Sequence, residues 1–141
     1  MIDSIWVPTS VHFIFGTITV LATLLAFVAG ILSGVRKKAL PLWGHVTFIV
    51  AQVALAVQVL IGIKLLDQGL GPLQLYVHYL GGTGALFFFL LYYWLPERVR
   101  QGRWTAAALS GMSFLFTMMA FGIGESYDPT EAGTALLKLL S

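Results

Sequence analysis

The sequence predicts an all-α membrane protein in which four transmembrane helices form an antiparallel bundle. Of its 141 residues, 58% are hydrophobic and 10% are charged, whereas about 25% of the residues of a soluble domain are charged. The apolar residues gather into four long segments, each able to cross a hydrocarbon core about 30 Å thick at about 1.5 Å per helical residue. Turn signals at roughly ten-residue intervals, which would indicate membrane-spanning strands, do not occur.

The four apolar segments cover approximately residues 10–33, 42–66, 74–95 and 104–123, within one bundle formed by residues 1–124. Because lipid offers no hydrogen-bond partners, the backbone of each segment must bond to itself as a helix. The loops are short, and short loops make sequential helices antiparallel neighbours. The first and third helices should therefore lie diagonally opposite each other and run in the same direction.

The first segment carries a stripe of small and polar residues. Steps of three and four from His12 give Gly16, Thr19, Thr23, Ala26 and Gly30. Such stripes mark helix contacts in lipid, because small side chains let two backbones approach. The segment is too long, and too poor in preceding basic residues, for a cleavable signal peptide.

The three later segments have compositions of their own. The second contains Gln52 and Gln58, whose amides are expected to join helices by hydrogen bonds. The third ends in the Tyr-Tyr-Trp run of residues 92–94, which is typical of an aromatic belt at a membrane surface. The fourth has serine, threonine, glycine and methionine but no ionisable side chain within its span, which favours a packing role.

Basic residues are concentrated in two of the loops. The first and third loops hold six of the eight: Arg36, Lys37, Lys38, Arg98, Arg100 and Arg103. The positive-inside rule makes these loops cytoplasmic, so both termini should lie outside, in a protein of a prokaryotic cytoplasmic membrane. Since the net charge of +2 arises from these loops, no nucleic-acid partner is expected.

Residues 125–141 form an outer-side tail that begins polar and becomes rich in leucine. A short amphipathic helix capped by Thr130 is expected there, and its leucines would suit a membrane interface or a partner protein. A frayed tail is the alternative.

A short motif occurs twice, as VHFIFGT at residues 11–17 and VHYLGGT at residues 77–83. A shift of 66 residues superimposes Val11, His12, Gly16 and Thr17 on Val77, His78, Gly82 and Thr83. Each copy is followed by a basic loop and another helix. The pattern predicts two helical hairpins related by a pseudo-two-fold axis along the membrane normal.

The repeat places His12 and His78 at the same depth on diagonally opposed helices. An ionisable residue within a membrane span indicates function, and two facing imidazoles are what the axial ligation of a haem iron requires. Gly16 and Gly82 would leave room for the macrocycle. A zinc ion would need a third or fourth protein ligand, so the expected cofactor is haem b, bound without covalent attachment because the chain has no cysteine. The alternative is a pair of ordinary boundary histidines.

Other polar residues fit secondary roles in such a site. Lys64 is the cation best placed for a haem propionate, or it reaches to water. Gln58 could support a ligand, or it only joins helices. His45, beside Trp43 near the inner surface, could bind a quinone head group or transfer a proton, whereas the alternative is an interfacial histidine beside an interfacial tryptophan.

The chain resembles one half of a haem A synthase, and it is also similar to four-helix haem-b membrane cytochromes. The resemblance rests on VHFIFG, on QVLIG at residues 58–62 and on VHYLGGTGALFFFLLYYW from residue 77. It implies haem ligation by His12 and His78. The family's second bundle and cysteine pair are missing, Phe13 stands where the family usually has arginine, and Asp67 is the nearest acid to its outer-loop glutamate.

Three functions follow as expectations. The first is a membrane electron-transfer protein or haem-bearing subunit of a respiratory complex, with quinol as redox partner. The second is a cofactor-free structural or assembly subunit that docks on a larger complex. The third is an enzyme of the haem A synthase type in which half-size chains pair as a homodimer.

Overall fold

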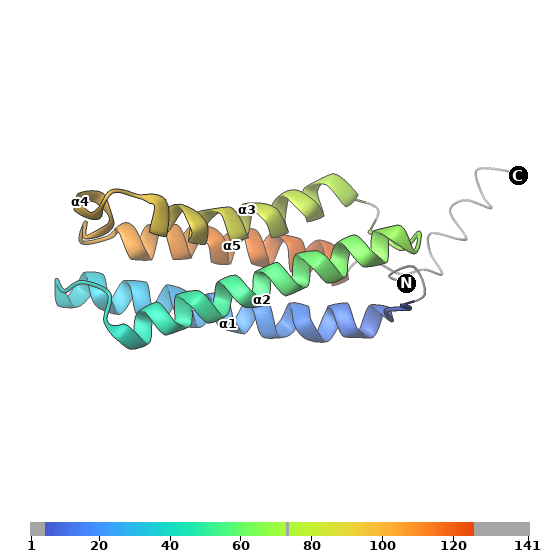
Figure 1. Ribbon diagram of the computed structural model, residues 1–141, viewed down its shortest axis with the longest axis horizontal. Coiled ribbons are helices and arrows are strands. Elements are labelled where there is room, and N and C mark those ends of the chain that lie inside the picture. Colours follow the sequence, from blue (N-terminus) through green and yellow to red (C-terminus); the bar gives the residue numbers. More distant parts are fainter. Residues whose placement is uncertain (1–4, 73, 126–141) are drawn as a thin grey trace, which may run out of the picture.

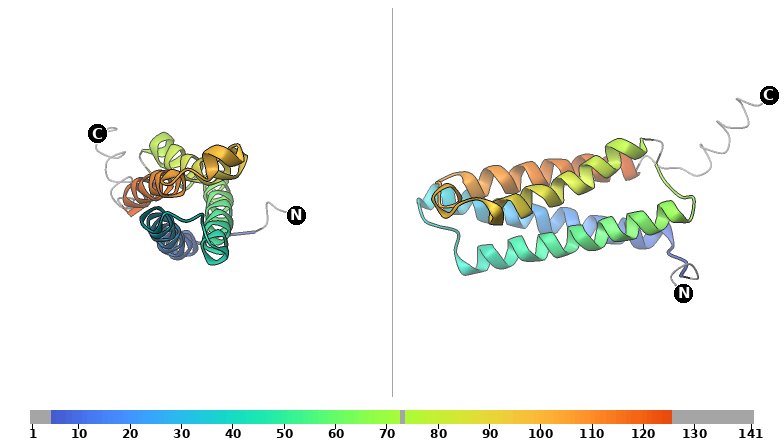
Figure 2. Two further views of the ribbon diagram at one scale, coloured as in Figure 1. Left: turned by 90° about the vertical axis from the view of Figure 1, so that its left-hand side faces the viewer. Right: turned by 45° about the horizontal axis from the view of Figure 1, so that its top comes forward.

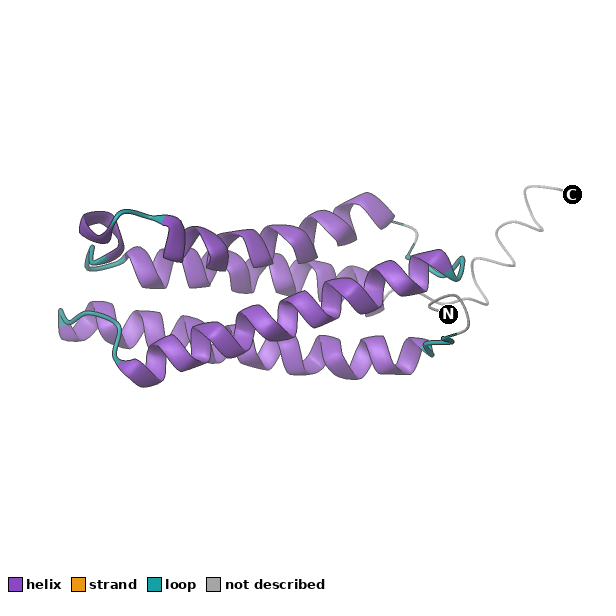
Figure 3. Cartoon of the chain, in the orientation of Figure 1, coloured by secondary structure: helices purple, strands orange, loops and turns teal. Residues whose placement is uncertain are grey.

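The structure is a computed structural model that describes residues 5–72 and 74–125. Its helices are α1 (Thr9–Arg36), α2 (Leu42–Asp67), α3 (Leu75–Trp94), α4 (Glu97–Arg100) and α5 (Thr105–Glu125) (Figure 1). No strand occurs in the described ranges (Figure 3), which confirms the all-helical prediction. The predicted tail helix lies outside the described residues.

Four of the helices, α1, α2, α3 and α5, are long and apolar enough to cross a membrane, as predicted. They begin and end within about three residues of the expected boundaries. The one-turn helix α4, which lies in the basic loop between α3 and α5, was not predicted.

Many buried positions are small and many large apolar side chains face outward, although Phe48, Leu55 and Phe89 also lie in the core. Positions that are fully buried include small residues on all four long helices: Thr23, Ala26, Ala29, Ala51, Ala85, Ser110 and Ser113. By contrast, Leu25 and Leu60 expose 60% and 66% of their surface. Large apolar patches are rare on soluble monomers, and small residues at helix contacts are typical of membrane bundles. The molecule is therefore built as an integral membrane protein.

The four long helices surround one central axis (Figure 2). Helix α1 packs against α2 and α5, and α3 packs against the same two helices. This arrangement places α1 and α3 on one diagonal of the bundle. Both basic loops lie at the same end, where α1 and α3 finish (Figure 1).

Backbone hydrogen bonds end α1 and α2 sharply. Lys37 has a left-handed backbone with φ of 53°, and the N–H groups of Lys37 and Lys38 donate to Gly34 and Ser33. At the end of α2, Gly69 has φ of 76°, and the N–H groups of Gly69 and Leu70 donate to the carbonyls of Leu66 and Leu65. Both are Schellman motifs, which satisfy carbonyls that the helix leaves free.

Glycines and hydroxyls set the helix contacts. The predicted stripe of α1, from Gly16 to Gly30, is buried throughout. A Cβ atom on Gly30 would lie 2.9 Å from the backbone of Ala106 and Ala107, so α1 and α5 touch backbone to backbone. Helices α3 and α5 are joined by a buried hydrogen bond from Ser113 Oγ to the carbonyl of Ala85, 2.8 Å long.

Replacing Ser113 by alanine should lower the free energy of unfolding by about 0.6 kcal/mol, and at most by about 1.7 kcal/mol, because interhelical hydrogen bonds in membranes are worth about that much. Titration of the protein from mild detergent into dodecyl sulfate, followed by tryptophan fluorescence, measures the change. Met112→Ala, at an exposed position on the same helix, is the control. A Ser113→Ala midpoint equal to that of the control would show that the bond contributes nothing.

Candidate cofactor-binding site

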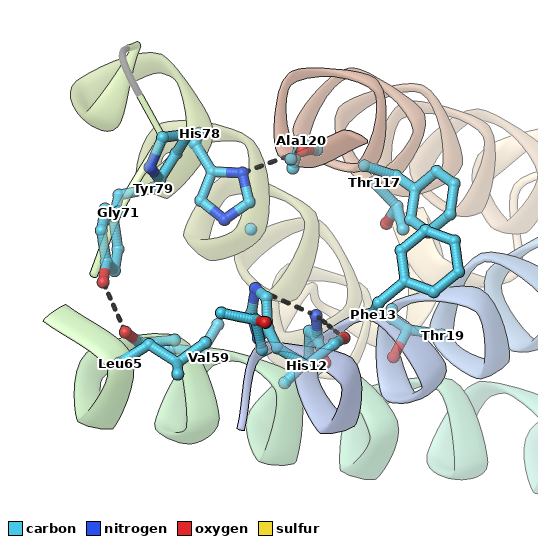
Figure 4. A pocket seen from close by; sticks show the side chains of 18 of the residues that line it. His12, Phe13, Thr19, Val59, Leu65, Gly71, His78, Tyr79, Thr117 and Ala120 are labelled. Carbon is cyan, nitrogen blue, oxygen red and sulfur yellow. Dashed lines mark hydrogen bonds between the residues drawn. The ribbon is translucent and has the colours of Figure 1, made fainter. Parts of the chain in front are cut away.

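A cavity of about 680 Å³ opens at the end of the bundle opposite the basic loops (Figure 4). Its walls come from the first turns of α1 and α3 and the last turns of α2 and α5, together with residues 70–72 of the α2–α3 loop. Cavities that hold cofactors and other small molecules measure roughly 300–1,000 Å³. The cavity therefore has the size and the mainly apolar walls of a cofactor site.

His12 from α1 and His78 from α3 both line this cavity. Their ring centroids lie 5.8 Å apart, and the ring planes are inclined by 58°. The structure thus brings together, across the diagonal of the bundle, the two histidines that the sequence repeat singles out.

The imidazole of His78 is fixed by the backbone of α5. Its Nδ1 lies 2.8 Å from the carbonyl oxygen of Ala120, drawn as a dashed line in Figure 4. A carbonyl only accepts, so Nδ1 carries the hydrogen and donates it, and in the neutral ring Nε2 keeps a free lone pair. The ring also packs edge-on against Tyr79, with centroids 5.9 Å apart.

The imidazole of His12 is held by a side chain instead. Gln58 Nε2 donates to the His12 carbonyl over 3.0 Å and lies 3.3 Å from His12 Nε2. Only an N–H group can donate to that carbonyl, so the amide orientation is fixed. His12 Nε2 must then accept the second N–H of the amide, which places the ring hydrogen on Nδ1.

Two polar atoms of this pair have no partner. His12 Nδ1 and Gln58 Oε1 are buried and form no hydrogen bond with any part of the chain that the structure describes. A buried polar group without a partner costs about 1–3 kcal/mol. Both residues line the cavity, where a bound water or ligand could supply the missing partner.

The two repeat glycines differ in their surroundings. A Cβ atom on Gly16 would lie 3.2 Å from Gln58 Nε2 and 3.3 Å from the ring of Phe121, so the space beside Gly16 is already filled. A Cβ atom on Gly82 would meet only Val59, at 3.7 Å. Both glycines line the cavity, but it is Gly82 that leaves open space for a ring edge.

Lys64 does not line the cavity. Its Nζ lies 2.6 Å from Oδ2 of Asp67, one turn further along the chain. The assignment of Lys64 to a haem propionate stays a prediction.

His45 and Trp43 lie at the opposite, basic end of the bundle, on the first turn of α2. His45 Nδ1 lies 3.2 Å from the hydroxyl of Tyr93 on α3, and Trp43 is 46% exposed. Neither residue approaches the cavity. A quinone or proton-transfer role for them stays a prediction.

The structure adds residues that sequence reasoning missed. Tyr79, which follows His78, donates to the carbonyl of Gly62 over 2.7 Å and so links α3 to α2. Gly62 and Gly124 lie against the Cε1 atoms of His12 and His78, at 3.3 and 3.4 Å from an added Cβ atom. Gly62 belongs to the QVLIG segment noted in the sequence, whereas Gly124 was not singled out there.

The ligand types present restrict the metals that the site could hold. Within residues 5–72 and 74–125, no three His, Cys, Asp or Glu side chains gather. Two imidazoles suit a metal whose remaining ligands come from its own macrocycle, as in haem. No protein-family model matches this chain, and comparison with curated proteins and with solved structures finds no match either.

Proposed function

We propose that this chain is a membrane haem b protein that transfers electrons, with His12 and His78 as the two axial ligands. The observation that carries the proposal is the pair of imidazoles from diagonal helices, 5.8 Å apart in one cavity. Neither ring carries a hydrogen on Nε2, the nitrogen that would bind a metal: His78 donates from Nδ1 to Ala120, whereas His12 Nε2 accepts from Gln58 and would exchange that hydrogen bond for the metal.

The spacing of the rings supports the proposal. Imidazole nitrogens bind metals over about 2.0–2.1 Å. Two rings with centroids 5.8 Å apart could therefore both reach one metal ion placed between them. The open space at Gly82 and the aromatic pair Phe13 and Phe121, with centroids 5.5 Å apart, supply room and apolar walls for a flat ring.

Bound haem supplies one-electron redox chemistry. The carbonyl of Ala120 would orient the ring of His78, Gln58 would stay beside His12 through its bond to the His12 carbonyl, and the aromatic walls would keep water away. Two imidazole ligands suit electron transfer more than catalysis. The redox partner in this proposal is a quinol, which dissolves in the same bilayer.

The basic loops that follow α1 and α3 determine the proposed orientation in the membrane. We place the basic loops in the cytoplasm and the cavity near the outer surface. In this proposal the two hairpins, α1–α2 and α3–α5, are related by a pseudo-two-fold axis, and each contributes one histidine to the cavity. A homodimer, or a place in a larger respiratory complex, is the proposed assembly.

A visible absorption spectrum tests the proposed function. The wild-type protein, expressed with added haem precursor and purified in mild detergent, should show a reduced-minus-oxidised spectrum of low-spin haem b at about one haem per chain. The double variant His12→Ala, His78→Ala should lose it. His45→Ala, which removes the histidine outside the cavity, should keep it.

A colourless wild-type protein would overturn the haem proposal and favour the cofactor-free assembly subunit. Equal loss of haem in His45→Ala would show that the pigment is not bound at this site. Formation of hydroxylated or formylated haem products on reduction in air would instead favour an enzyme of the haem A synthase type.

A further inference from the structure

We infer that the two histidines are unequal ligands: His78 is permanent, whereas His12 is releasable and opens its side of the iron to a small uncharged diatomic gas. Gln58 is the positioning residue that receives the released imidazole. The inference rests on the proposed function, because it concerns the same site.

The environment of His78 favours permanent ligation. Its hydrogen bond to Ala120 uses Nδ1, and therefore persists whether or not Nε2 binds a metal. A hydrogen bond of this kind fixes the ring orientation and raises the basicity of the ligating nitrogen. The acceptor is a backbone carbonyl within α5, which cannot rotate away.

The environment of His12 favours release of this ligand. Gln58 Nε2 lies 3.3 Å from His12 Nε2, the nitrogen that would bind the metal. The same lone pair cannot serve both partners, so the amide competes with the iron. His12 Nδ1, which should carry the supporting hydrogen bond of a ligating histidine, has no partner among the described residues.

Gln58 stays in place through a second bond that does not involve the imidazole. It donates to the carbonyl of His12 over 3.0 Å. The amide is therefore within reach whether His12 is bound to the metal or released. Its unpartnered Oε1 provides a further acceptor beside the ring.

The α3–α5 hairpin has no side chain equivalent to Gln58. Gly62 and Gly124 occupy matching places beside the two histidines, and the residues one turn before them are Gln58 and Ala120. The side chain of Ala120 has no hydrogen-bonding group. The repeat is therefore symmetric in its ligands and asymmetric in the group that can hold a released ligand.

Carbon monoxide is the probe that tests the inference. The haem-loaded, dithionite-reduced protein is titrated with carbon monoxide, and the spectral change gives the affinity. Wild-type protein should bind carbon monoxide, because carbon monoxide can replace His12 as a ligand. Gln58→Met keeps the length of the side chain and removes both N–H donors, so the affinity should fall roughly 2- to 12-fold, the factor that one hydrogen bond is worth. Gln52→Met, on the same helix but outside the cavity, should leave it unchanged.

The single histidine variants provide a second measurement. His12→Ala should retain most of the haem as a high-spin, five-coordinate species. The haem content of His78→Ala should be at least tenfold lower than that of the wild type. Should His78→Ala fail to accumulate, the carbon monoxide titration of Gln58→Met alone still decides the question.

Several results would overturn the inference. A low-spin wild-type haem that resists carbon monoxide, equal haem loss in the two histidine variants, or an unchanged affinity in Gln58→Met would each do so while leaving the proposed function intact. A wild-type protein without haem would overturn the proposed function and this inference together.

Discussion

Replacement of Gly30 by leucine is expected to prevent α1 and α5 from packing. A Cβ atom at this position would lie 2.9 Å from three backbone atoms of Ala106 and Ala107, and backbone cannot rotate aside as a side chain can. The two helices must therefore separate along the contact. Overpacking of a core typically costs 1–3 kcal/mol, occasionally more, and a clash with backbone belongs to the upper end of about that range.

The monodisperse fraction after purification in mild detergent measures this effect, together with tryptophan fluorescence. Trp104, one of four tryptophans in the chain, packs against Gly34 of α1, so the total emission should change when α1 separates from its neighbour. Gly122→Leu is the matched control, because no atom lies within 4 Å of a Cβ added there. If both leucine variants behaved like the wild type, the close contact between α1 and α5 would be wrong.

Replacement of Gly82 by leucine is expected to weaken haem binding while the bundle still forms. Gly82 lines the cavity, and an added Cβ atom would make only an ordinary contact with Val59 at 3.7 Å. The added Cβ atom causes no clash with the protein, and the leucine side chain would occupy cavity space that a rigid planar cofactor needs. An overlap that costs about 1–3 kcal/mol lowers affinity by roughly 5- to 150-fold.

Haem content per chain, measured by the pyridine haemochrome spectrum, is the readout. Thr83→Leu introduces the same side chain one residue further on, at an exposed position, and should keep full haem content. Haem retained by Gly82→Leu would place the cofactor away from Gly82. Loss of haem in both variants would indicate a general effect of leucine on α3.

Much of the fold could be predicted because lipid leaves so few choices. The apolar segments had to be helices, and the stripe from Gly16 to Gly30 had to be a contact face, since nothing else brings small residues together at that spacing. Helix ends were less predictable. Helix α1 continues to Arg36 because the Schellman bonds of Lys37 and Lys38 determine where it stops, and a lysine in a left-handed conformation has no sequence signal.

The details of the site were harder to foresee than the histidine pair. Every residue has a carbonyl, so only packing could select that of Ala120 as the partner of His78. The histidines are 66 residues apart, whereas their glycine neighbours Gly62 and Gly124 are 62 apart. This difference hid the second half of the repeat, since one constant shift cannot align both helices of the hairpins.

The outward-facing apolar side chains, such as Leu25 and Leu60, have a consequence for how the helices separate on heating. The backbone hydrogen bonds of each helix lie within that helix, and its apolar surface stays in lipid or detergent. Separation of the helices therefore gives no helix a reason to unwind. Heating should therefore separate the four helices from one another while each remains helical. Far-ultraviolet circular dichroism would miss that event almost entirely, and a protein judged thermostable by its helix signal could already have lost its cavity.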